Sequence, residues 1–414
     1  MTSASLGVAL ALAGLPLAWV ARSLLGAGDS RAYSIGFMLL ALLMVLKWRA
    51  LFSLKLYGTA LSTITPLLFL VPVLILTAWD DPLGQPAQFI LYSILLFLAC
   101  QTVEVSRLSS LPYALLGTAT TVSVITLTMY AFILSNSPSD IADSGRLTAG
   151  DTYNPNFVAF SGGLGIVASM LLGTPSRTHR AFQVVVIGFC LSVCFLAVLL
   201  SVTRSVYGGI ALCALAALIA QSHRRTKSSN GIHTLRTWLL IFIPILAAVF
   251  GVGYFLLGDT LLQYPLITIE RTLLGLEGII SGTGGVDVSS DTRFELRQHA
   301  LERLNIGGHG FDALYVDFPI LQAYYDLGVL GGTAFFLIGL VIPSLWVIRT
   351  ITTARSVHST VPLAYIYIFF LPNILLHGKP YDFAIWLPVL LAYVGMSRVV
   401  GVPKQLGPTV AAYN

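Results

Sequence analysis

Apolar runs of about twenty residues recur along this chain, and they constrain its fold more than any other feature. Hydrophobic residues make up 56% of the 414 residues, against roughly 45–50% in soluble domains, and charged residues make up only 10%. A helix of about 20 apolar residues crosses a hydrocarbon core of ~30 Å. We therefore expect an all-α, polytopic integral membrane protein with about twelve transmembrane helices and one large outward-facing loop containing short helices.

The apolar runs also give the expected organisation of the chain. We place the spans at residues 4–21, 33–47, 59–78, 87–104, 111–134, 156–173, 181–202, 205–221, 238–257, 329–348, 360–376 and 382–399. Three parts follow from them: nine helices in residues 1–257 with a short outer loop at 135–155, a large loop at 258–328, and three helices with a tail in residues 329–414.

Basic residues predict the orientation of these spans. Most of the 23 Lys and Arg residues fall in alternate loops, which places both termini in the cytoplasm and the 135–155 and 258–328 loops outside. We interpret the basic cluster at 223–227 as a cytoplasmic anchor on anionic membrane lipid. No basic stripe with interleaved aromatic residues is present, so we expect no nucleic-acid partner. The first span lacks a basic leader, and we expect no cleaved signal.

The stretch from Ser289 to Gly332 concentrates charge in a chain that carries little of it. Arg293 and Arg297 lie one turn apart on a predicted helix at 292–304, and like charges at this spacing repel unless an anion lies between them. The planar guanidinium group is well suited to phosphate because it donates two hydrogen bonds at once. An ordinary solvated loop is the alternative interpretation of this stretch.

A glycine-rich turn and a second short helix follow in the same stretch. Gly307, Gly308 and Gly310 surround His309, and Pro319 fits the first position of a helix that ends at Gly328. Asp317 comes just before this helix. It is either an amino-terminal cap or a functional carboxylate.

Two further polar motifs lie at the outer ends of predicted spans. The first runs from Arg146 to Asn154, Pro155 and Asn156, where the sixth span begins, and helix capping alone could explain it. The second is Thr203-Arg204-Ser205, which predicts a very tight turn or a partly re-entrant segment between two spans. Arg204 could extend to the membrane interface, but so short a turn leaves it little room, which favours a functional role.

The order of these motifs resembles the superfamily of O-antigen ligases and O-antigen polymerases, which are bacterial lipid-linked glycan transferases. The resemblance covers roughly residues 140–335, and the twelve-span plan extends it along the chain. Ligases carry His-Asn, nine residues and Gly-x-x-Gly; this chain has Asp317-Phe318 at the same distance from Gly328 and Gly331, without the His-Asn. Polymerases carry Arg, ten residues and Gly, a spacing that Arg297 and Gly308 match.

The resemblance implies an inverting, metal-independent transfer of a glycan from undecaprenyl pyrophosphate to a hydroxyl group of a second glycan, without a cofactor. It also implies a bacterial inner-membrane protein whose active site faces the periplasm. Cations stabilise a departing diphosphate, and the base must accept the hydroxyl proton. The expected diphosphate-binding residues are Arg204 and Arg293, with Arg297 and Arg146 as further contacts; the expected substrate-binding residues are Asn154, Asn156 and Tyr315; and the expected base is Asp317, with His309 as its rival.

Because the ligase histidine is missing, we predict polymerisation of lipid-linked repeat units, with a possible chain-length regulator as a partner. The alternatives are a ligase that uses lipid A-core as the acceptor, an oligosaccharyltransferase that modifies proteins, and a transporter or flippase for lipid-linked glycans. A transporter predicts ionisable residues near the middle of spans, whereas the charges of this chain lie at the predicted outer ends. The four cysteines fall inside predicted spans and lack the spacing of metal ligands.

Overall fold

The protein is all-helical throughout the part of the chain that its structure, a computed structural model, describes. No strand occurs among these residues. This confirms the predicted fold class at the level of secondary structure. The structure describes residues 2–14, 91–92, 94–96, 108–136, 155–172, 180–201, 203–224, 288–311, 313–353, 360–380 and 382–397.

Most of the described helices coincide with predicted spans and differ from them by a few residues at the ends. The predicted spans at 33–47, 59–78 and 238–257, and most of the one at 87–104, lie outside the described residues. The helices are α1 (Ser3–Leu12), α7 (Leu111–Asn136), α9 (Pro155–Leu171), α10 (Arg180–Ser201), α11 (Arg204–Arg224), α14 (Val288–Glu302), α15 (Pro319–Phe336), the π-helical turn η4 (Leu337–Val341), α16 (Ile342–Thr352), α17 (Val361–Leu376) and α18 (Phe383–Ser397).

Three helical segments of the described chain are long and apolar enough to cross a membrane: Leu111–Met129, Phe182–Ser201 and Pro319–Thr352. The third differs from the predicted span at 329–348, because α15, η4 and α16 form one helical run. Gly328 interrupts this run with φ 69° and ψ −172°, which are not helical values. The predicted short helix from Pro319 to Gly328 is therefore present, and it leads through a kink into the span.

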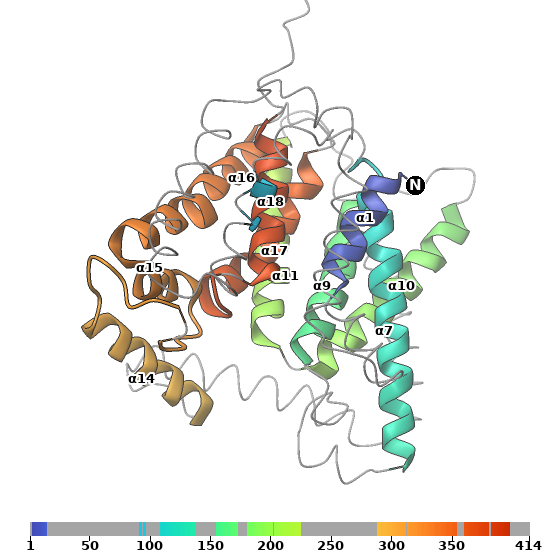
Figure 1. Cartoon of the computed structure of the whole chain (residues 1–414). Helices are drawn as coiled ribbons and strands as arrows, with labels where there is room; N and C mark the ends of the chain where they lie inside the picture. Colours follow the sequence, from blue (N-terminus) through green and yellow to red (C-terminus); the bar gives the residue numbers. More distant parts are fainter. Residues whose placement is uncertain are drawn as a thin grey trace, which may run out of the picture.

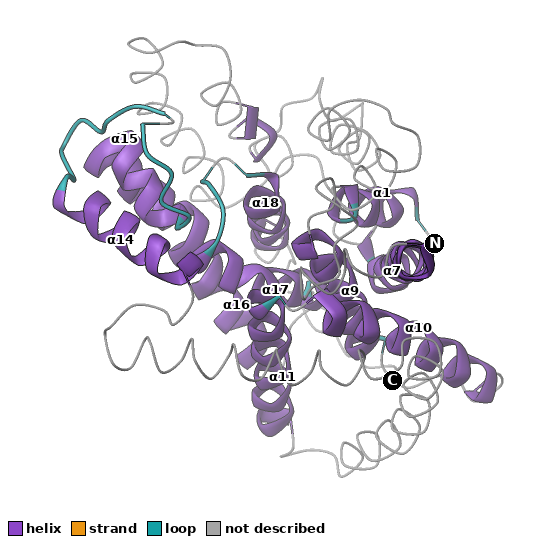
Figure 2. Cartoon of the chain, turned by 90° about the horizontal axis from the view of Figure 1, so that it is seen from below, coloured by secondary structure: helices purple, strands orange, loops and turns teal. Residues whose placement is uncertain are grey.

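The helices form two groups joined by a central layer. Both views place α1, α7 and α10 on one side and α14, α15 and α16 on the other, with α11, α17 and α18 between them (Figures 1 and 2). Helix α9 packs against α7 and α10, α17 packs against α11 and α18, and α15 contacts α14 and α17. The central α17 thus links the helix group that carries the candidate site to the rest of the bundle.

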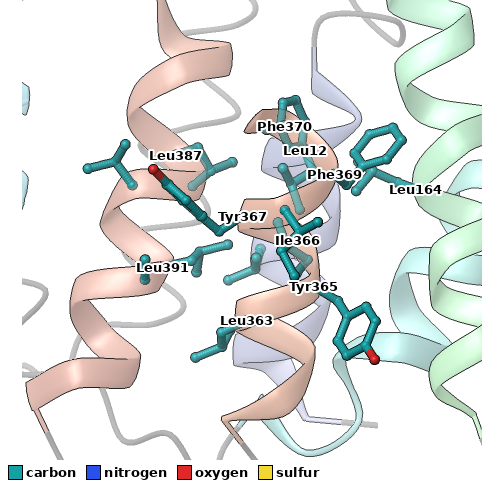
Figure 3. Close-up of a cluster of buried hydrophobic side chains, with 14 of the residues drawn as sticks. Leu12, Leu164, Leu363, Tyr365, Ile366, Tyr367, Phe369, Phe370, Leu387 and Leu391 are labelled. Atoms are coloured by element: carbon teal, nitrogen blue, oxygen red, sulfur yellow. The ribbon is translucent and has the colours of Figure 1, made fainter. Parts of the chain in front are cut away.

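The buried core around α17 fixes the position of that helix. Leu387 of α18 lies on one side of α17, and Leu164 of α9 lies near Phe369 on the other (Figure 3). Phe369 and Tyr367 are almost completely buried. Gly209 of α11 faces the backbone of Phe369 so closely that a Cβ atom would collide with its carbonyl oxygen. Small residues permit such close helix approach, so the middle of α17 packs tightly against α11.

Candidate functional site

A buried carboxylate lies at the centre of the candidate site. Asp317 precedes α15, has φ 50° and is only 6% exposed. Its Oδ1 accepts hydrogen bonds from the Tyr315 hydroxyl (2.7 Å) and the Gly378 backbone N–H (2.9 Å). Its Oδ2 lies 2.9 Å from Nε of Arg293 and 3.4 Å from Nδ1 of His377. One side chain therefore joins α14, the loop before α15 and the loop after α17.

Asp317 does not cap α15. The cap position is occupied by Phe318, which makes no side-chain capping hydrogen bond, and Pro319 begins the helix as predicted. The Asp317 carboxylate instead turns towards the loop after α17, where Gly378 and His377 donate to it. The capping interpretation of this residue is wrong, and the carboxylate belongs to the cluster of charged side chains.

Arg297 ties the same three segments together through the backbone. Its Nη2 donates to the carbonyl oxygens of Asp317 (3.3 Å) and Leu376 (3.2 Å). Its Cζ lies 5.3 Å from the centroid of the Phe318 ring. The pKa of Arg297 is lowered, mainly because the group is partly buried. The Asp317 carboxylate opposes this lowering, and the positive charge of Arg293 adds to it. These contacts give Arg297 a structural role in the site.

Arg293 is engaged differently from Arg297. Its side chain is 40% exposed, and it holds Asp317 through Nε. Within the described part of the chain, its two terminal amino groups make no hydrogen bond. A guanidinium group anchored at Nε and open at both Nη atoms can still donate two parallel hydrogen bonds to a phosphate. Asp317 is the anion that relieves the repulsion expected between Arg293 and Arg297.

The hydrogen bonds to Asp317 keep it ionised. Burial raises the pKa of this carboxyl, but hydrogen bonds from His377, Tyr315 and the Gly378 N–H outweigh burial and bring the pKa down to about 2. Burial and the hydrogen bond to Asp317 raise the pKa of the Tyr315 hydroxyl, so this group remains a donor. Such a carboxylate positions its donors well and accepts a proton poorly.

The glycine-rich turn forms a close backbone contact with the kink in α15. The N–H groups of His309 and Gly310 donate to the carbonyl oxygens of Tyr325 (2.9 Å) and Asp326 (3.2 Å), and the Val329 N–H donates to Ile306 (3.2 Å). Gly308 and Gly328 have φ values of 78° and 69°. This contact fixes the chain leaving α14 to the helix that follows Asp317.

His309, the rival base, serves this turn. Its Nε2 lies 2.6 Å from the carbonyl oxygen of Arg303, and its ring stacks on Tyr325 with centroids 4.5 Å apart. No described interaction joins His309 to Asp317. The two alternative bases predicted from the sequence therefore lie in different places: Asp317 in the charged cluster and His309 in the glycine-rich turn.

The predicted joint between two spans is present beside the start of α9. Helix α10 ends at Ser201 and α11 begins at Arg204. The Thr203 hydroxyl donates to Oδ1 of Asn156 (3.2 Å), so the two polar motifs meet. Arg204 is half-buried at this joint, which lies towards the same end of the bundle as α14 (Figure 1).

The described contacts place α11 against α9, α16 and α17, and α14 against α15. Arg146 and Asn154 lie outside the described residues.

The loop after α17 adds residues that sequence reasoning missed. His377 and Gly378 bind Asp317, and Nζ of Lys379 lies 5.3 Å from the centroid of the Tyr315 ring. The available signal was a short run, His-Gly-Lys, between two apolar spans on the predicted outer side. Nothing local in the sequence links this run to Asp317, which lies 60 residues earlier.

No protein-family model matches the chain, and no curated protein matches it. The resemblance to O-antigen transferases therefore stays a prediction that rests on the motifs quoted above.

The Asp317 network predicts a pH-dependent stability. Because its pKa is lowered from 3.8 to about 2, the ionised carboxylate stabilises the fold fully above about pH 5, and this contribution is lost as the pH falls from about 4 to 2. Asp317→Asn should therefore lower the free energy of unfolding by roughly 2 kcal/mol at pH 7 and by roughly half as much near pH 3. Thermal or denaturant unfolding in detergent across this range measures the difference.

Glu302→Gln, at an exposed position of α14, is the matched control for removal of one carboxylate. A difference between Asp317→Asn and the wild type that stays constant from pH 7 to pH 3 would contradict the network described here.

Proposed function

We propose that this protein is a membrane glycosyltransferase that polymerises undecaprenyl-pyrophosphate-linked repeat units of a surface polysaccharide. The proposal rests on how the guanidinium group of Arg293 is hydrogen-bonded. This arginine is fixed in position by its Nε bond to a buried carboxylate, while its terminal amino groups, on a partly exposed side chain, make no hydrogen bond with any residue that the structure describes. A preset cation of this kind stabilises the charge that develops on a departing diphosphate without reorganisation during the reaction.

Neighbouring groups support a diphosphate at this position. Lys379 lies over the Tyr315 ring, and His377 shares the same carboxylate oxygen as Arg293. Nη2 of Arg297 donates to two carbonyl oxygens, and in this proposal Arg297 holds the site together. Arg204, at the α10–α11 joint, remains in the proposal as a second diphosphate contact, with Arg146 as a further one.

The proposal includes the membrane arrangement that the sequence predicts. Twelve spans, cytoplasmic termini and a site on the periplasmic side of a bacterial inner membrane would place the Asp317 cluster at the outer surface. Three described segments with the length and apolar character of spans support this arrangement. The glycan substrate would extend into the periplasm, while its prenyl chain would stay among the helices and lipids.

Polymerisation is favoured over ligation because position 317 cannot replace the ligase histidine. The carboxylate there is engaged by four donors, so the position serves to orient its neighbours. A ligase that transfers to lipid A-core and an oligosaccharyltransferase that modifies proteins use the same donor, and they differ from a polymerase only in the acceptor.

Deletion of the gene in its own host tests the proposal. Loss of a polymerase leaves single repeat units on lipopolysaccharide, which gel electrophoresis resolves, and restoring the wild-type gene returns the ladder of longer chains. Complete loss of the polysaccharide from the surface would instead indicate a ligase. An unchanged ladder would reject both activities.

A transporter or flippase is separated from an enzyme by purified protein. In detergent without any gradient, an enzyme lengthens lipid-linked repeat units, whereas a transporter leaves them unchanged. Lengthened products, resolved by mass spectrometry, are the expected result.

A further inference from the structure

The proposed reaction needs a proton acceptor, and Asp317 is already saturated. A carboxylate offers about four lone-pair positions. Both oxygens of Asp317 have two donors each: Tyr315 and Gly378 at Oδ1, and Arg293 and His377 at Oδ2. No position remains for a substrate hydroxyl, so the base must be another residue.

His377 has the geometry that a base requires. It follows the last residue of α17, where its backbone N–H donates to the Asn373 carbonyl oxygen at 3.0 Å. An ionised carboxylate only accepts hydrogen bonds, so the hydrogen between His377 and Asp317 belongs to Nδ1, and Nε2 of the neutral ring carries the lone pair. Within the described part of the chain, the ring makes no other hydrogen bond, and 34% of the side chain is exposed.

His309 has the opposite arrangement. A carbonyl oxygen only accepts, so the short contact with Arg303 places the hydrogen of the neutral His309 ring on Nε2. Stacking on Tyr325 holds the ring in the glycine-rich turn. Of the two histidines, only His377 contacts Asp317, the carboxylate that also holds Arg293. Arg293 is the proposed diphosphate ligand.

We propose that His377 is the general base of the transfer and that Asp317 positions its ring; this inference rests on the proposed function. The acceptor hydroxyl oxygen forms a bond to the anomeric carbon of the donor glycan, and its proton passes to Nε2 of His377. The bond from that carbon to the diphosphate oxygen breaks, and its electron pair stays on the undecaprenyl diphosphate beside Arg293. The imidazolium then returns its proton to water. Asp317 stabilises the imidazolium while it exists.

The test uses His377→Asn in the full-length purified chain. The asparagine amide can still donate to Asp317 but cannot accept the proton. The substrate is lipid-linked repeat unit extracted from membranes of the deletion strain, and the readout is the initial rate of chain lengthening. We expect a loss of about 10²- to 10⁴-fold, with binding of inorganic pyrophosphate within about threefold of the wild type, because Arg293 is untouched.

Chemical rescue separates a base from a merely structural histidine. His377→Gly should regain part of its activity when free imidazole is added, because the added base can occupy the vacated space. Asp317→Asn should lose activity without any rescue by imidazole. His299→Asn, on the half-buried face of α14, is the matched control and should retain wild-type rates.

Two results would overturn the inference. The first is a His377→Asn variant with near-wild-type rates, most clearly if His309→Asn loses activity instead. The second is a combination of three observations: His377→Asn loses activity, imidazole does not restore activity to His377→Gly, and both variants unfold at lower temperatures than the wild type. If the wild type neither lengthens the substrate nor binds pyrophosphate, the proposed function itself fails, which is a distinct outcome.

Discussion

Replacement of Arg293 by alanine is expected to reduce glycan transfer by about 10²- to 10³-fold, the scale seen when one preorganised donor is removed from a developing charge. The substitution removes both open amino groups and leaves Asp317 with three donors. Arg293→Lys should recover only part of the activity, because an ammonium group cannot donate two parallel hydrogen bonds. Initial rates of chain lengthening and the affinity for inorganic pyrophosphate measure both effects.

Arg303→Ala is the matched control for this substitution. Arg303 is an exposed arginine just after α14, and its contribution to the described contacts comes from its backbone. Equal activity losses in the Arg293 and Arg303 variants would show that general positive charge, and not the anchored guanidinium group, is what the site provides. An unfolding temperature close to that of the wild type would show that the Arg293 variant is folded.

Gly328→Ala is expected to lower the free energy of unfolding by about 2–3 kcal/mol and to disrupt the site. The position combines φ 69° with ψ −172°, a region essentially restricted to glycine, which costs other residues roughly 1–3 kcal/mol. A Cβ atom there would also lie 2.6 Å from the backbone nitrogen of Gly308. Because the contact between these glycines ties α14 to α15, its loss should displace Arg293 from Asp317 and lower activity together with stability.

Gly307→Ala, one residue from the same contact, is the matched control. A Cβ atom at Gly307 would have no neighbour within 4 Å, so we expect a change within about 0.5 kcal/mol. Thermal unfolding of both variants in the same detergent makes the comparison. Similar unfolding temperatures for Gly328→Ala and the wild type would contradict the described kink.

Local signals in the sequence predicted the framework of the site. Pro155 and Pro319 begin helices because a proline fits the first turn, where its missing N–H costs nothing. Gly328 breaks its helix, and the polar Thr203-Arg204-Ser205 motif marks the joint of α10 and α11. Each of these features depends on the residue itself and its immediate neighbours, so the sequence alone was sufficient.

The partners of Asp317 could not be predicted in the same way. His377 and Gly378 reach it across 60 and 61 residues of chain, through the packing of α15 against α17. Spacing within one segment gives no information about such a meeting. For the same reason, the sequence could not show that Nη2 of Arg297 donates to the carbonyl oxygen of Leu376.

The kink at Gly328 sets the depth at which the reaction would take place. The helical run from Pro319 to Thr352 would rise about 51 Å if straight, well beyond a hydrocarbon layer of ~30 Å. Residues 329–352 alone rise about 36 Å, enough to cross that layer. The turns before the kink would then lie level with the phospholipid headgroups. In the proposed polymerase, the growing chain would pass from one lipid carrier to the next by sideways diffusion, and neither carrier would have to leave the bilayer.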